Sequence, residues 1–168
     1  FFAVQQLLPH RGADRIIVYG WCGSLVARLH IGDLFLPTSG RSEEGTSCHY
    51  PTNDPWDCSL HTLLASLLQQ SGFNSSTGGI WTTDALYRET WDKVEQYGNS
   101  GFMAVDMECT ALHSVASFRG VGLGAVLLVS DELFGGQWRS GYSRPQFRAR
   151  SRQLLTLLFS LFHQASFL

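Results

Sequence analysis

The stretch that decides the fold is Phe102–Leu133, which reads FMAVDMECTALHSVASFRGVGLGAVLLVSDEL. Its pattern predicts a short strand, a helix that ends before Gly120, and an apolar strand over Ala125–Val129. Glu108 stands where the helix begins, and Asp131 follows the second strand, where open α/β sheets place ligands. An acid at a helix start is also explained by the helix dipole alone. The pair therefore suggests a site, and a purely structural role stays open for each acid.

Outward from this unit, hydrophobic periodicity predicts an alternation of strands and helices. The predicted strands are 15–19, 31–37 and 79–89, and the predicted helices are 4–8, 58–70, 91–97 and 144–168. Gly20–Leu25 is predicted as a tight glycine turn after the first strand, and Thr38–Asp57 as a long surface loop. We expect one α/β domain over residues 1–168, with a mixed central sheet flanked by helices.

The amino-acid composition of the chain argues against several classes of function. Hydrophobic residues make up 44% of the 168 positions and charged residues 15%, which fits a globular chain. The net charge of −2 and the absence of a basic run give no reason to expect a nucleic-acid partner. The four cysteines lack zinc-site or disulfide spacing, so no metal is expected. No secretory signal or membrane-spanning run is recognisable, and we expect a cytoplasmic protein.

Six short motifs follow one another in a specific order. They are Gly20–Leu25, Ile31–Asp33, Glu44–Tyr50, Thr82–Glu89, Val105–Glu108 and Val129–Asp131. This order resembles the purine nucleoside phosphorylase and uridine phosphorylase family, from about Gly12 to Asp131. The resemblance implies a nucleoside phosphorylase-like pentosyltransferase, which cleaves the N-glycosidic bond of a nucleoside.

The resemblance also implies a role for each matching residue. Cleavage develops positive charge on the ribose and negative charge on the departing base. Glu108 would accept hydrogen bonds from the ribose hydroxyls and stabilise the cationic transition state. Met107 would pack against the sugar face. Asp131 would act as general acid toward a purine ring nitrogen, assisted by an arginine near the start of the last helix. Arg144 is the nearest match for this arginine, and Arg139 and Arg148 are the alternatives.

The base would be held by four other residues. Tyr87 matches the aromatic position that stacks on the base, while Cys22, Gly23 and Val105 would line the base and sugar. The segment after Tyr87 lacks the glutamine and arginine on which uridine specificity relies, so a purine is favoured.

Phosphate binding is where the sequence departs from the family. Trp21 stands where a phosphate-binding Ser or Thr is usual, and Val18 where many members have an arginine. The family's N-terminal phosphate-binding portion has no counterpart before Phe1. Phosphate is the expected co-substrate, with no other cofactor. A phosphate-independent nucleoside hydrolase and a non-catalytic nucleoside-binding member remain alternatives. Family members form oligomers, so a homo-oligomer is expected, as is association through an exposed sheet edge.

Overall fold

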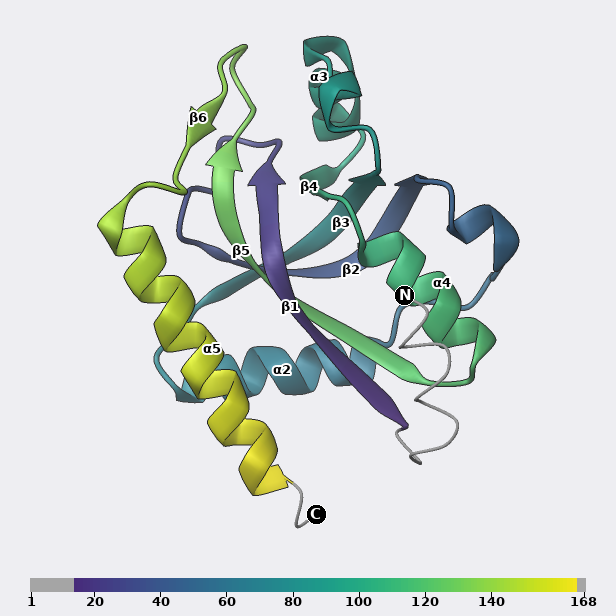
Figure 1. Ribbon diagram of the computed structural model, residues 1–168, viewed down its shortest axis with the longest axis vertical. Helices are drawn as coiled ribbons and strands as arrows, with labels where there is room; N and C mark the ends of the chain where they lie inside the picture. Colours follow the sequence, from purple (N-terminus) through teal and green to yellow (C-terminus); the bar gives the residue numbers. More distant parts are fainter. Residues whose placement is uncertain (1–13, 166–168) are drawn as a thin grey trace.

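The computed structural model describes residues 14–165, with side chains up to residue 160. The predicted helix at 4–8 lies outside this part of the chain. Figure 1 shows a twisted sheet with helices around it, which confirms the mixed α/β prediction. The strands are β1 (Arg15–Ser24), β2 (Leu34–Glu43), β3 (Ser75–Thr83), β4 (Phe102–Asp106), β5 (Gly122–Glu132) and β6 (Arg139–Ser140). The helices are α2 (Cys58–Gln70), α3 (Trp91–Asn99), α4 (Cys109–Phe118) and α5 (Pro145–Ala165), with short 3₁₀ turns η1 (Ser47–His49) and η2 (Leu86–Arg88).

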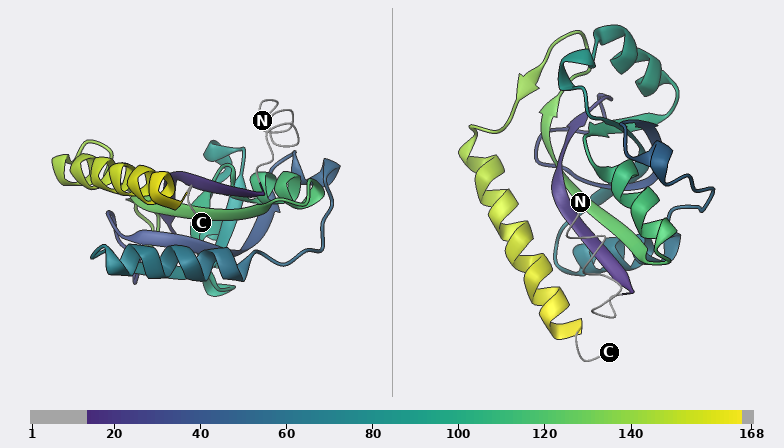
Figure 2. Two further views of the ribbon diagram at one scale, coloured as in Figure 1. Left: turned by 90° about the horizontal axis from the view of Figure 1, so that it is seen from below. Right: turned by 45° about the vertical axis from the view of Figure 1, so that its right-hand side comes forward.

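Five strands pair in a closed ring. The order is β1, β4, β3, β2 and β5, and β5 pairs again with β1. β1 runs parallel to β5 along its whole length, whereas it meets β4 only at Gly23 and Ser24. Within the described residues, the first part of β1 therefore has a strand partner on one side only. In both views of Figure 2, α5 and α4 lie on opposite sides of the strands.

β5 is buried on both faces, which explains its uninterrupted apolar sequence. Ala125, Leu127 and Val129 belong to a core cluster that draws on all five strands of the ring. The alternate residues Val126 and Leu128 pack in a second cluster with leucines of α2 and α5. The strand is thus held rigidly from two sides, and the residues at its end are positioned with it.

The glycine turn predicted at Gly20–Leu25 is wrong, because β1 continues as a strand to Ser24. Neither Gly20 nor Gly23 has a positive φ angle. The need for glycine at position 23 is one of space. A Cβ atom there would lie 2.4 Å from Leu133 Cδ1 and 3.3 Å from Asp131 Oδ2. Gly23 therefore lets β1 and the end of β5 approach each other at a register shift between Cys22 and Gly23.

The boundaries of the other elements differ less from the sequence predictions. The helix predicted at 58–70 is confirmed, and Asp57 caps it by accepting hydrogen bonds from the amides of Ser59 and Leu60. The surface loop predicted from Thr38 is partly wrong, since β2 pairs with β3 as far as Glu43. No helix in residues 14–165 combines the length and apolar character that a bilayer-spanning segment needs.

Candidate active site

A cavity of about 240 Å³ opens where β1, β4 and β5 end. Twelve residues line it: Trp21, Cys22, Gly23, Leu86, Glu89, Val105, Asp106, Met107, Glu108, Ser130, Asp131 and Tyr142. The two acids singled out in the sequence, Glu108 and Asp131, thus share one cavity. Cys22, Gly23, Val105, Met107 and Trp21 lie there too, while Tyr87 and Arg144 do not.

Asp131 is almost fully buried at the end of β5 and is held by three donors. Ser130 Oγ donates to its Oδ1 at 2.7 Å, and the Tyr142 hydroxyl donates to the same oxygen at 3.3 Å. Trp138 Nε1 donates to Oδ2 at 2.9 Å. Three donors of this kind fix the orientation of the carboxyl group and match an acceptor. Asp131 is therefore placed firmly against the cavity.

Asp106 also lines the cavity, but its oxygens serve the fold. Oδ1 accepts a hydrogen bond from Thr82 Oγ1 at 2.6 Å, and Oδ2 accepts one from the amide of Cys109 at 2.7 Å. The amide of Glu108 lies at 3.2 Å from the same Oδ2. Asp106 thus satisfies free amides at the start of α4, as a helix cap does. Burial raises the pKa of Asp106 above its ordinary value.

Glu108 behaves differently, although it is only two residues away. It occupies the residue before α4, and its carboxyl group accepts a hydrogen bond only from the neighbouring backbone amide of Met107 among the described residues. Partial burial, with a smaller contribution from the charge of Asp106, raises the pKa of Glu108. Met107 is beside it, with 40% of its surface exposed. A carboxyl group held only by a neighbouring amide, beside an exposed thioether, can accept further hydrogen bonds from a polar ligand.

The segment after β3 contributes residues that the sequence analysis missed. Tyr87 is 96% exposed and points away, whereas Leu86 and Glu89 line the cavity. The reason is the 3₁₀ turn η2, since residues three apart in such a turn lie on the same side. The spacing of Leu86 and Glu89 was visible in the sequence, but the 3₁₀ turn was not predicted. The aromatic contact expected from Tyr87 is replaced here by the Leu86 side chain.

Two further residues depart from expectation. Arg144 is exposed just before α5 and is not among the residues that line the cavity. Tyr142 and Trp138, which precede it, contact Asp131 instead. Trp21 lines the cavity as a half-exposed indole that packs against Tyr142 and Phe147, with ring centroids 5.6 and 5.5 Å away. Its role in this structure is an apolar wall.

The charge of the lining has one sign. Glu89, Asp106, Glu108 and Asp131 are acids, and none of the twelve lining residues is Lys, Arg or His. Such a lining suits a ligand with hydroxyl and N–H donors and stabilises developing positive charge. It offers no cation for a phosphate group. Within the described residues, no cluster of His, Cys, Asp or Glu has the arrangement of a metal site.

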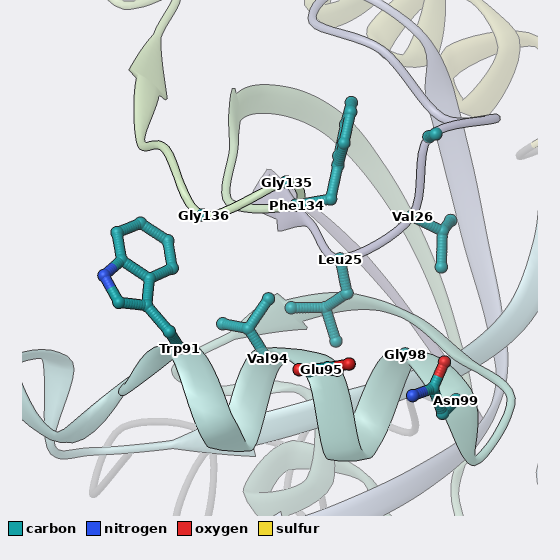
Figure 3. A pocket seen from close by; sticks show the side chains of 11 residues that line it. Leu25, Val26, Trp91, Val94, Glu95, Gly98, Asn99, Phe134, Gly135 and Gly136 are labelled. Carbon is teal, nitrogen blue, oxygen red and sulfur yellow. The ribbon is translucent and has the colours of Figure 1, made fainter.

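A larger hollow of about 540 Å³ lies between α3 and the loops after β1 and β5, and Figure 3 shows its lining. Leu25, Val26, Trp91, Val94 and Phe134 give it an apolar wall, and Glu95 is its one titratable group. Neither Glu108 nor Asp131 lines this hollow. The smaller cavity, with its four acids, is therefore the candidate active site.

The chain is 29% identical over 138 residues to the DeoD-type purine nucleoside phosphorylases of Bacillus thuringiensis and Bacillus cereus. Those alignments cover 80% of this chain and 59% of each relative, so the chain spans about three fifths of their length. Residues 1–160 match the model of the phosphorylase superfamily.

Solved structures share the fold at lower identity. A P. knowlesi homologue of P. falciparum PNP superposes with a TM-score of 0.75 at 21% identity, covering 96% of this chain and 67% of that one. Purine nucleoside phosphorylase from Toxoplasma gondii, in complex with immucillin-H, gives a TM-score of 0.78 at 21% identity and covers 93% and 65%. Together with the match over residues 1–160, these similarities show that the chain belongs to the phosphorylase superfamily.

Proposed function

We propose that this chain carries the nucleoside-binding half of a purine nucleoside phosphorylase, with phosphate as co-substrate and no other cofactor. The observation that supports the proposal most directly is the presence of Glu108 and Asp131 in one cavity. Relatives that are 29% identical are named purine nucleoside phosphorylases. Under this proposal the ribose lies against Glu108 and Met107, and the base lies toward Asp131.

Each acid then has a distinct task. Glu108, which accepts no hydrogen bond from another side chain of the described residues, accepts hydrogen bonds from ribose hydroxyls and places negative charge near the developing oxocarbenium ion. Asp131 serves the departing base, which must gain a proton at a ring nitrogen as the glycosidic bond breaks. Cys22 stays a neutral thiol, because burial raises its pKa well above the ordinary value. It therefore lines the site and does not act as a nucleophile.

A nucleoside hydrolase is the second candidate, and one observation favours it. No lysine, arginine or histidine lines the cavity, and Trp21 and Val18 occupy the positions where the family resemblance implies phosphate ligands. Phosphorolysis therefore requires cations supplied from outside this lining, whereas water requires none. A non-catalytic nucleoside-binding protein is the third candidate.

Base release from inosine, adenosine and uridine, measured with and without inorganic phosphate, separates these candidates. Release that requires phosphate, with a sugar phosphate as product, supports the phosphorylase. Equal release without phosphate, with free ribose as product, supports the hydrolase. Binding of the nucleoside without release of base supports the non-catalytic protein. Absence of nucleoside binding would contradict all three.

Self-association and a cytoplasmic location complete the proposal. Among residues 14–165, the first part of β1 has a strand partner on one side only, and unpaired strand edges favour association. Phe118 and Phe159 are 61% and 70% exposed, which adds apolar surface. Sedimentation or sizing chromatography tests this part, and a stable monomer at micromolar concentration would contradict it.

A further inference from the structure

Glu89 is the one acid in the cavity to which neither the fold nor the proposed chemistry assigns a role. It follows η2 directly, and its amide donates to the carbonyl oxygen of Leu86 at 3.2 Å, which fixes the turn. Its carboxyl group makes no hydrogen bond or ion pair with a described residue, yet it lines the cavity with Asp131 and Glu108. A carboxyl group without a protein partner is available to a ligand.

Glu89 and Asp131 line the same cavity, and their charges interact. Burial, and then the charge of Asp131, raise the pKa of Glu89 to about 7. The acid whose charge acts on Glu108 is Asp106. We therefore take Glu108 to face the sugar of a bound nucleoside and Glu89 to face the base.

We propose that Glu89 contacts the six-position substituent of a purine base and so sets the preference between 6-amino and 6-oxo purines. This inference rests on the proposed function, because it takes Asp131 as the group that faces the imidazole nitrogen of the base. In a purine the six-position substituent lies next to that nitrogen, so a second acid beside Asp131 faces it.

The protonation state of Glu89 decides which substituent it can bind. The protonated carboxyl group donates its O–H to a 6-oxo oxygen, whereas the carboxylate only accepts and binds the N–H groups of a 6-amino substituent. As the pH rises through about 7, Glu89 loses its proton. The preference for adenosine over inosine therefore rises with pH.

The other titratable groups that line the cavity do not produce this effect. Cys22 and Tyr142 have pKa values raised by burial and stay neutral near pH 7. Asp106 is bound by Thr82 and the start of α4. Glu108 and Asp131 face parts that adenosine and inosine share, so they do not distinguish the two substrates. No Lys, Arg or His lines the cavity.

The test compares kcat/KM for adenosine and inosine between pH 6 and pH 8. In the wild-type protein the adenosine-to-inosine ratio is expected to rise roughly threefold to tenfold, the effect of one hydrogen bond. The Glu89→Gln variant, whose amide both donates and accepts at every pH, is expected to give a flat ratio. Glu95→Gln is the matched control, because Glu95 is an exposed acid of α3 outside the cavity. It should keep the wild-type rise.

Binding of the free bases adenine and hypoxanthine, measured by calorimetry without phosphate, separates this inference from the proposed function. A pH-dependent preference that Glu89→Gln removes supports the inference even if no nucleoside is cleaved. A flat ratio in the wild-type protein, or a rise that persists in Glu89→Gln, overturns it. Failure of the wild-type protein to bind either base overturns both the inference and the proposed function.

Discussion

Asp106 and Glu108 stand two positions apart at the same cavity, yet they serve different parts of the molecule. Asp106 is 7% exposed and accepts hydrogen bonds from Thr82 and from the start of α4. Glu108 accepts a hydrogen bond only from the neighbouring amide of Met107 among the described residues. The same contrast separates Asp131, held by three donors, from Glu89, held by none. Acids that the fold has already satisfied are fixed in place, and unsatisfied ones are available to a ligand.

The largest effect is expected at Asp131, the acid that the fold fixes and that the proposed function directs at the base. Asp131→Asn should lower base release by about 10²–10⁴, because an amide cannot transfer a proton to the base. Steady-state rates with inosine measure the loss. Asp92→Asn makes the same chemical change on the exposed first turn of α3 and serves as the control. Wild-type rates in Asp131→Asn would remove Asp131 from the mechanism.

The pair Glu108→Ala and Asp106→Ala tests the contrast most directly. Glu108→Ala should reduce base release by about 10²–10³ and leave the free energy of unfolding within about 0.5 kcal/mol of wild type. Asp106→Ala should lower the free energy of unfolding by about 1–3 kcal/mol, because it leaves Thr82 and the amides of α4 unsatisfied. Urea unfolding and rate measurements on both variants are needed. Equal loss of stability in the two would abolish the distinction.

Two variants, Gly23→Ala and Gly20→Ala, test how much the close packing beside Asp131 contributes to stability. A Cβ atom at position 23 would meet Leu133 at 2.4 Å, whereas one at position 20 meets only Leu127 at 3.5 Å, an ordinary contact. We expect Gly23→Ala to lower the free energy of unfolding by about 1–3 kcal/mol and to displace Asp131, and Gly20→Ala to change little. Thermal unfolding of both variants is the measurement. A destabilised Gly20→Ala beside a normal Gly23→Ala would contradict the assignment.

The smallest expected effect is a pH dependence of stability from Glu89. Its pKa is raised from 4.5 to about 7 in the folded protein, so the unfolded chain loses this proton first as pH rises. The free energy of unfolding therefore falls between pH 4.5 and 7 and levels off above that. Glu89→Gln should have a higher Tm than wild type at pH 8 and a similar one at pH 5. An equal difference at both values would show that Glu89 keeps an ordinary pKa.

Much of the fold followed from the sequence because its signals are local. A continuous apolar run predicts the strand over Ala125–Val129. A helical period of apolar residues predicts the helix over Cys58–Gln70. The closure of the strands into a ring was not predicted, since the pairing of β1 with β4 involves only Gly23 and Ser24. Gly23 was interpreted as a turn residue because its pairing with β4 joins positions far apart in the sequence, which local patterns do not reveal.

The site was predictable only in part. Glu108 and Asp131 were found because their neighbours form a specific motif, and the structure places both in one cavity. Glu89 was passed over because its placement depends on a 3₁₀ turn that has no clear sequence signal. Arg144 matched by position, but the chain after Gly141 directs Tyr142, and not the arginine, toward Asp131.

The closed ring of strands also bears on how the chain folds. Arg15 lies opposite Gly122, so the first strand of the ring pairs with one synthesised much later. Such distant pairing carries a large loop-closure entropy and is slow. On the ribosome, Ile16, Ile17 and Val18 emerge well before their partners in β5 exist. Since Gly23 lies opposite Asp131, this side of the cavity forms only after β5 has been synthesised and has paired with β1, and a nascent chain that lacks β5 cannot present Asp131 to a ligand.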